Sequence, residues 1–360
     1  MTTSSHAVRI MVTGARQTGE RWASAFRAVD GVEVALSEAG TSQELSDVLS
    51  HEACCAVALT SPSDLPAMIR TAVLAGCDVF IATPAALTAA QFGALAELAR
   101  RRERIIRFLD DIDDDERVRF VRRMTHGAQA LWRAYYLRSL RTGEDASLDA
   151  LVIGELQLAL DLLGRRAERV FAVAPSAGDE SGALDAVTVT LSFEGGAVAT
   201  IQVSAVEPER RREAVLACDG RTILLDAYNA RAPLQIQASA RHGGPRPGAA
   251  WSEVISEFPV AQLADPVLAA SRGFARAVRA RDLVVSNAGA FAEAAQVWEA
   301  ARRSITTGMP EELRERHAIV SRPALRLIAG GGHGGGAAAA PRLTVVHSEP
   351  HRLEPAKPVA

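Results

Sequence analysis

The first candidate for a functional site along the chain is a short turn with glycines at Gly14 and Gly19. They follow the apolar run VRIMVT at 8–13, and an amphipathic stretch continues to Val29. This order predicts a strand, a tight turn and a helix. Such a turn lets the backbone approach a phosphate group at the start of the helix. Arg16 stands inside the turn.

Other groups with catalytic potential are sparse. The acidic run Asp110–Glu116 could bind a divalent cation, but such a run is more typical of a solvated loop. His126 adjoins a glycine at an expected turn, and the tail histidines lack the regular spacing of metal ligands. No arrangement of Ser, His and Asp or of Cys and His suggests a nucleophile. The sequence therefore predicts no metal site.

Composition limits the function further. The chain has 360 residues, is 48% hydrophobic and carries a formal charge of −3, so no global field favours nucleic acid or an anionic membrane. No apolar run is long enough to span a membrane. The cysteine spacing fits no zinc site, and the adjacent Cys54 and Cys55 suit a buried strand in a reducing compartment. We expect a cytoplasmic protein. The only lysine is Lys357, which excludes any mechanism that needs a lysine in the folded body.

The elements that must position these residues alternate at first between strands and helices. This alternation predicts a parallel, doubly wound sheet. The expected strands are 8–13, 32–36, 53–59, 78–82 and 104–109, and the expected helices after the first are 42–50, 63–75 and 88–102.

The pattern then changes. A helix at 118–124, a strand at 130–140 and an apolar helix at 148–163 are followed by strands without intervening helices. This order predicts an α+β domain with a mixed or antiparallel sheet. We expect strands at 170–173, 186–193, 197–203, 213–217 and 222–226, a hairpin turn at Glu194–Gly196, and helices at 266–278 and 288–306.

These patterns divide the chain into three parts. We expect domains at 1–110 and 111–313 and a Gly/Ala/Pro-rich, disordered tail at 314–360.

Several segments in this order resemble the glucose–fructose oxidoreductase/inositol dehydrogenase (Gfo/Idh/MocA) family. The resemblance covers about 8–313. It implies a Rossmann-type N-terminal domain and a C-terminal domain whose open sheet binds substrate and often pairs subunits. The segments are VRIMVTGARQTGERWASAF, ACCAVALTSPSDLPAMIRTAVLAGCDVFIATPAALT, LVIGELQLALDLLG, AVTVTLSFEGGAVATIQVSA and DPVLAASRGFARAVRARD.

The resemblance also implies a site for NAD or NADP. In the family pattern G-x-G-x-x-G the central glycine lets the backbone approach the pyrophosphate, and here Arg16 takes its place. The chain between Leu36 and Ala53 is also too short for the family's usual helix, strand and helix, so one strand–helix unit is expected to be missing. Binding of NAD, of NADP or of no cofactor stays open. The positions that would contact the cofactor are Gly14, Arg16, Gly19, Glu38, Thr60, Ser61, Pro62, Thr83 and Pro84.

The family's reaction centre is where this sequence departs most. Its Glu-Lys-Pro is Ala82-Thr83-Pro84 here, so the lysine is replaced. Its helical His and Asp correspond to Gly154 and Gln157, and a histidine is the usual general base. Glu155 lies in the same turn and could act as a base if burial raised its pKa.

Three functions remain open. The first is a relative without ordinary hydride transfer that binds a small molecule or serves as a partner subunit, either with itself or with an active relative. The second is an active NAD(P)-dependent oxidoreductase with another proton donor, such as Thr83, Glu155, Gln157, Tyr135 or Tyr136. The third is a non-redox enzyme on the same fold.

Overall fold

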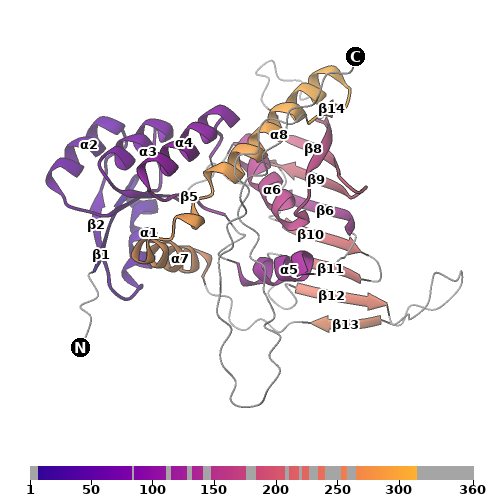
Figure 1. Cartoon of the computed structure of the whole chain (residues 1–360), viewed down its shortest axis with the longest axis horizontal. Coiled ribbons are helices and arrows are strands. Elements are labelled where there is room, and N and C mark those ends of the chain that lie inside the picture. Colours follow the sequence, from indigo (N-terminus) through magenta and orange to yellow (C-terminus); the bar gives the residue numbers. More distant parts are fainter. Residues whose placement is uncertain are drawn as a thin grey trace, which may run out of the picture. The chain divides into compact units, whose positions relative to one another are not determined.

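The computed structural model of the chain describes most of the two expected domains (Figure 1). Both sheets belong to one compact unit, Met1–Glu315. Thr83, Pro84 and the predicted tail lie outside the described residues. The described ranges are 7–82, 85–110, 115–127, 132–140, 147–175, 184–206, 211–218, 221–226, 234–239, 253–257 and 265–313.

The first sheet has five parallel strands in the order β2-β1-β3-β4-β5. The chain therefore runs from β1 to β2 in one direction and from β2 across to β3 in the other. The predicted doubly wound, Rossmann-type sheet is confirmed, and ligands of such sheets bind beyond the carboxyl ends where the order reverses. The strands are β1 (Val8–Thr13), β2 (Val32–Ser37), β3 (Ala56–Leu59), β4 (Asp78–Ile81) and β5 (Ile106–Phe108).

Helices cover both faces of this sheet because residues of each strand alternate between two apolar cores. Ile10 of β1 packs with α1 (Arg16–Arg27), and its neighbour Met11 packs with the opposite layer. That layer holds α2 (Ser42–His51), α3 (Leu65–Leu74) and α4 (Ala89–Arg102). Capping boxes fix the starts of α2 and α4. In the continuous stretch 7–82, α2 alone joins β2 to β3.

A helix from late in the chain returns to the first sheet. The helix α7 (Pro266–Ala280) packs beside α1, as Figure 1 shows. Phe274 of α7 lies 5.3 Å from Phe80 of β4 and 6.3 Å from Phe26 of α1 between ring centroids. This aromatic contact completes the core on that face of the sheet.

The second sheet has nine strands in the order β13-β12-β11-β10-β6-β9-β8-β7-β14. Among the described pairings of this second sheet, only β6 with β9 is parallel. The predicted mixed sheet is therefore confirmed. Gly195 and Gly196 have positive φ at the predicted β8–β9 hairpin turn. The strands are β6 (Trp132–Leu140), β7 (Ala167–Val173), β8 (Ala186–Phe193), β9 (Val198–Ser204), β10 (Arg211–Cys218), β11 (Arg221–Asp226), β12 (Leu234–Ser239), β13 (Glu253–Glu257) and β14 (Glu311–Glu312).

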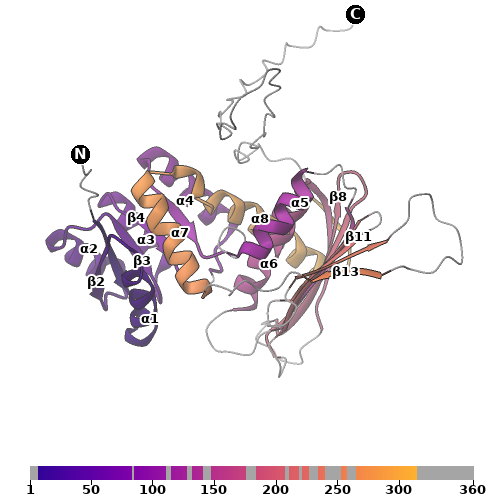
Figure 2. The same cartoon turned by 90° about the horizontal axis from the view of Figure 1, so that it is seen from below.

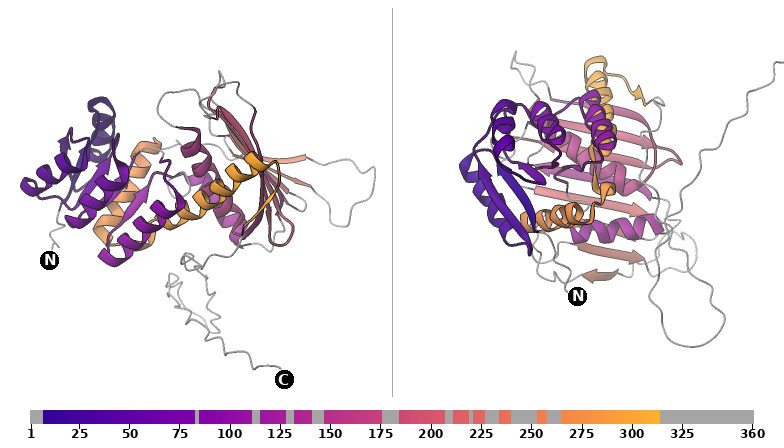
Figure 3. Two further views of the ribbon diagram at one scale, coloured as in Figure 1. Left: turned by 90° about the horizontal axis from the view of Figure 1, so that it is seen from above. Right: turned by 60° about the vertical axis from the view of Figure 1, so that its left-hand side comes forward.

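Three helices lie on one face of this second sheet (Figures 2 and 3). They are α5 (Glu116–Gly127), α6 (Leu148–Leu163) and α8 (Ala288–Thr307), with a short 3-10 turn η1 (Leu283–Val285) before α8. The apolar α6 buries residues on all sides because it is enclosed by the sheet, α5 and α8. Trp298 of α8 donates its indole N–H to Asp149 of α6 at 2.9 Å.

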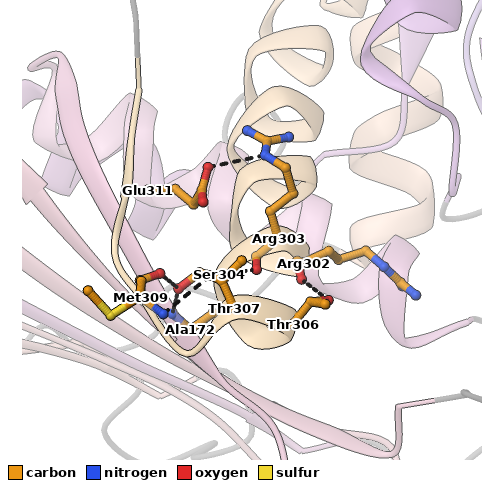
Figure 4. Close-up of polar contacts among 8 residues, drawn as sticks. All are labelled: Ala172, Arg302, Arg303, Ser304, Thr306, Thr307, Met309 and Glu311. Atoms are coloured by element: carbon orange, nitrogen blue, oxygen red, sulfur yellow. Dashed lines mark hydrogen bonds and ion pairs between the residues drawn. The ribbon is translucent and has the colours of Figure 1, made fainter.

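The helix α8 ends against the edge of the second sheet (Figure 4). The buried Ser304 hydroxyl accepts the Ala172 N–H of β7 at 3.1 Å and donates to the Met309 carbonyl at 2.7 Å. Gly308 ends the helix in the left-handed region. The chain then turns back, so that Glu311 in β14 pairs with β7.

The start of α8 is fixed to the first sheet by Asn287. Its side-chain carbonyl accepts the Phe108 N–H and its amide donates to the Phe108 carbonyl, both at 2.8 Å. The amide also donates to Asp110. Ser286 donates its hydroxyl to the Ile106 carbonyl at 2.9 Å. The segment 286–287 therefore occupies the outer edge of β5.

We predict that Asn287→Ala lowers the free energy of unfolding by about 1–3 kcal/mol, because the buried Phe108 N–H and carbonyl lose their partner. Urea denaturation followed by circular dichroism measures this. Gln296→Ala, on the exposed side of α8, is the control and should change stability by less than about 0.5 kcal/mol. An equal effect of the two substitutions would contradict the assignment of Asn287 as the fixing residue.

Candidate functional site

The candidate nucleotide edge forms where β1 and β3 end. Gly14 follows β1 with φ 135°, a region that favours glycine. A Cβ added there would lie 2.6 Å from Ser61 Oγ and closer still to Thr60 Oγ1. The turn therefore contacts the segment after β3 so closely that no side chain fits. This contact brings together three of the predicted cofactor positions.

Hydrogen bonds hold this contact in place. The Thr60 N–H and hydroxyl both donate to the Thr13 carbonyl, at 2.9 and 3.0 Å. The Ser61 hydroxyl accepts the Ala15 N–H. The Thr13 hydroxyl donates to the Ala39 carbonyl at 2.7 Å. The ends of β1, β2 and β3 are thus fixed relative to one another.

The start of α1 remains open to a ligand. Its N-cap residue is Ala15, no side chain caps it, and no acidic residue lies in its first turn. The first N–H groups of a helix lack helical partners and carry a partial positive charge. Arg16 is exposed at this end and adds a full positive charge. Gly19 is buried one turn later. A Cβ added at this position would lie 3.8 Å from the Gly14 carbonyl oxygen.

The remaining predicted contacts are placed less closely. Glu38 is exposed directly after β2, and Pro62 is half-buried after β3. Thr83 and Pro84 lie outside the described residues. The Ala82 N–H before them donates to the Leu59 carbonyl at 2.9 Å, so the chain leaves β4 at the same edge of the sheet.

The predicted reaction helix is α6, which begins after the N-cap Ser147 and ends at Gly164, as expected. Gly154 is half-buried, and an added Cβ would meet no atom within 4 Å. Gln157 and Glu155 are both buried. The helix therefore places one buried carboxyl group beside an open position.

Glu155 of α6 forms an ion pair with Arg212 of the second sheet. Arg212 of β10 donates from Nε to Glu155 Oε1 at 2.9 Å and from Nη2 to Oε2 at 3.0 Å. The two side chains are 4% and 17% exposed. Bidentate pairing of this kind occupies both oxygens of the carboxylate. The geometry therefore gives Glu155 a partner and does not leave it free as a base.

Sequence reasoning did not single out Arg212. Arginine is abundant in this chain, and nothing local distinguishes this one. The only available signal is that Arg212 shares the parity of the buried Ala214 and Leu216 in β10. A charged residue on the covered face of a strand needs a buried partner.

The other groups considered for chemistry are dispersed. Asp110 is buried and bonded by Asn287, and Asp115 pairs with Arg117. Asp111, Asp113 and Asp114 lie outside the described residues. Among the residues that are described, no three His, Cys, Asp or Glu side chains gather as metal ligands. Within the same part of the chain, no helix has the length and apolar character needed to cross a membrane.

A surface hollow of about 340 Å³ lies away from this edge, at the other end of α1. It is lined by Ala28, Val29, Asp30, Arg272, Arg276 and Arg279. Arg279 already donates to the Asp30 carbonyl at 2.7 Å. The hollow contains none of the predicted cofactor positions.

Comparison with known proteins gives a family match for part of the chain. Residues 106–223 match the model of the GFO/IDH/MocA C-terminal domain. No curated protein matches the chain significantly.

Solved structures match nearly the whole folded part. UDP-N-acetylglucosamine 3-dehydrogenase GnnA from Acidithiobacillus ferrooxidans is 20% identical with a TM-score of 0.67, covering 84% of this chain and 98% of that one. An NAD binding oxidoreductase from Klebsiella pneumoniae is 15% identical with a TM-score of 0.68, covering 87% and 100%. A putative myo-inositol dehydrogenase from Sinorhizobium meliloti is 17% identical with a TM-score of 0.65, covering 86% and 100%. At these identities the likeness establishes the fold alone.

We predict that Gly14→Ala destabilises the protein by about 1–3 kcal/mol, because the positive φ and the contact with Thr60 and Ser61 oppose a side chain. Gly19→Ala is the control. An added Cβ there meets only an atom at 3.8 Å, and alanine favours helix by about 1 kcal/mol over glycine. Thermal melts of both variants measure the difference. Equal tolerance of alanine at the two positions would show that the turn is not constrained as described.

We predict that Glu155→Gln lowers the free energy of unfolding by about 3–5 kcal/mol, since it removes one charge of a largely buried, bidentate ion pair. Replacing both residues with leucine should restore most of the loss. Glu312→Gln removes the partner of Arg169 in an exposed pair and should cost less than about 1 kcal/mol. A loss for Glu155→Gln no larger than for Glu312→Gln would contradict the structural role of the buried pair.

Proposed function

We propose that this chain is a member of the Gfo/Idh/MocA family, whose C-terminal domain model matches residues 106–223, and that it keeps the family's nucleotide edge but not its ordinary hydride-transfer chemistry. In this proposal it acts in the cytoplasm as a small-molecule binder or partner subunit. The observation that carries it is the Glu155–Arg212 pair. Glu155, the acidic residue next to Gly154 on α6, is bound by the Arg212 guanidinium at 2.9 and 3.0 Å.

The nucleotide edge fits a dinucleotide. The start of α1 has no side-chain cap and no acidic residue in its first turn, which suits a pyrophosphate. Gly14, Arg16, Gly19 and Glu38 would hold the cofactor, which when bound can accept or donate a hydride. Arg16 is exposed and would either neutralise a phosphate or crowd it.

The reaction helix supports the loss of ordinary chemistry. Gly154 offers no side chain, and the Gln157 amide does not exchange protons near neutral pH. The only lysine, Lys357, lies in the predicted tail. General acid–base help typically contributes about 10²–10⁴-fold to a rate, so its loss would leave binding without useful turnover.

Pairing through the second sheet would give such a protein a role as a partner subunit. Phe171, Val173 and Val198 of β7 and β9 are 36%, 50% and 38% exposed. Their strand neighbours in the alternating pattern are buried, so these side chains lie on the face opposite the core. A second copy or an active relative is the proposed occupant of this face.

A second candidate is an active NAD(P)-dependent oxidoreductase on a sugar-like hydroxyl or carbonyl substrate. The names of structural neighbours favour it, since they include UDP-N-acetylglucosamine 3-dehydrogenase GnnA and a putative myo-inositol dehydrogenase. The ordered nucleotide edge favours it equally. Its proton donor would be Thr83, Tyr135 or Tyr136, because Glu155 is held by Arg212.

Calorimetric titration with NAD(H) and NADP(H), followed by turnover assays on sugar substrates, separates the two candidates. Cofactor binding without a change in nicotinamide absorbance supports the binder. Binding with turnover that survives Glu155→Gln supports the oxidoreductase. Turnover that Glu155→Gln abolishes, in a variant that stays folded, would contradict the role given to the ion pair. No binding at millimolar cofactor would refute the nucleotide edge.

We predict that Arg16→Gly strengthens NAD binding several-fold, because it restores space beside the expected pyrophosphate position. Calorimetric dissociation constants of the two proteins measure the effect. Arg21→Ala, an exposed arginine farther along α1, is the control and should leave affinity unchanged. Weaker binding after Arg16→Gly would show that Arg16 is a phosphate ligand.

A further inference from the structure

Two cysteines of the first sheet lie close together at the edge opposite the nucleotide site. Cys54 precedes β3 and Cys77 precedes β4, and their Sγ atoms are 3.8 Å apart. The Cys77 thiol also lies 3.4 Å from the Cys54 carbonyl. Both cysteines are free thiols, with Cys77 buried and Cys54 partly exposed. The parallel pairing of β3 with β4 fixes this approach.

The environment makes the two thiols unequal. A hydrogen bond from the Cys77 thiol lowers the pKa of Cys54, and the nearby Arg9 guanidinium lowers it further. Burial of Cys54 and the Glu52 carboxylate oppose this effect. The same hydrogen bond and burial raise the pKa of Cys77. Cys54 is therefore the better nucleophile, since the thiolate is the reactive form.

The neighbouring Cys55 differs from Cys54. Its thiol is exposed but donates to the Arg9 carbonyl at 3.2 Å. Burial of part of the side chain raises its pKa. Cys55 is therefore more accessible to solvent than Cys54, but its thiol is the less reactive of the two. It serves as an internal control.

We propose that Cys54 and Cys77 form a reversible, peroxide-driven disulfide, with Cys54 attacked first and Cys77 resolving it. The Cys54 thiolate attacks one oxygen of hydrogen peroxide, which breaks the O–O bond and gives a sulfenic acid and hydroxide. The hydroxide takes up the proton that the Cys54 thiol had released and becomes water. The Cys77 sulfur then attacks the Cys54 sulfur, the S–O bond breaks, and a second water leaves. In total two thiols lose two electrons and two protons, and one peroxide is reduced to two waters.

Such a bond would close a loop containing β3 and α3. That loop carries Thr60 and Ser61, which contact Gly14 at the nucleotide edge. Cross-linking restricts the unfolded chain, so the oxidised protein should melt at a higher temperature than the reduced protein. A dithiol reductant should reverse the shift. This inference does not depend on whether the protein binds NAD.

The test uses the full chain treated with hydrogen peroxide, blocked with an alkylating agent and digested with trypsin without reduction. No Lys or Arg lies between Arg27 and Arg70, or between Arg70 and Arg100. Cys54 and Cys55 therefore fall in fragment 28–70 and Cys77 in fragment 71–100. We expect a disulfide bond to join these two fragments, and we expect reduction to separate them.

Variants identify which thiol takes part. Cys55→Ser should keep the joined fragments, whereas Cys54→Ser and Cys77→Ala should lose them. In Cys77→Ala, which tests the resolving step, the Cys54 sulfenic acid should persist and be trapped by dimedone. A bond between Cys54 and Cys55, a joint that survives Cys54→Ser, or separate oxidation of all thiols without a joint would overturn the proposal.

Discussion

The edge of β5 is the constraint on which the arrangement of the fold depends. A strand at the edge of a sheet presents unpaired N–H and carbonyl groups, and here the segment 286–287 bonds them. Asn287 offers a carbonyl and an N–H in the same order as a peptide, and it bonds both polar groups of Phe108 at 2.8 Å. The helix that follows therefore starts from a fixed point on the first sheet. It packs against α4 and α6 and ends at β7 through Ser304. One helix thus connects the cores of both sheets.

Local patterns predicted the elements of this fold well. The bounds of α6 and the glycine turn between β8 and β9 follow from apolar periodicity and turn chemistry. The return of α7 to the first sheet did not follow, because an amphipathic pattern indicates that a face is buried but not against what. The last two strands at one end of the second sheet, β12 and β13, were also missed, since they are short and lie beside Gly/Pro-rich sequence.

The partners of buried polar side chains could not be predicted from the sequence where they lie far apart along the chain. Asn287 directly precedes α8, a position at which asparagine often caps a helix, yet its side chain makes no capping hydrogen bond and bonds β5 instead. Glu155 was a candidate base for its position, and its partner Arg212 lies in a strand 57 residues away. A pairing over that distance is set by the register of β10 and the packing of α6, neither of which a single sequence reveals.

The same reasoning decides which residues inform on function. Gly14 must be glycine because a Cβ would overlap Thr60 and Ser61, whether or not a nucleotide binds. Its presence therefore follows from the fold. Arg16 and Glu38 are exposed at the edge, and the fold places no comparable demand on them. Gly154 is the clearest case, since glycine weakens a helix interior and the space beside it would accept a side chain. Under the proposed function, residues without a structural task carry the functional information, and Gly154 is the clearest of them.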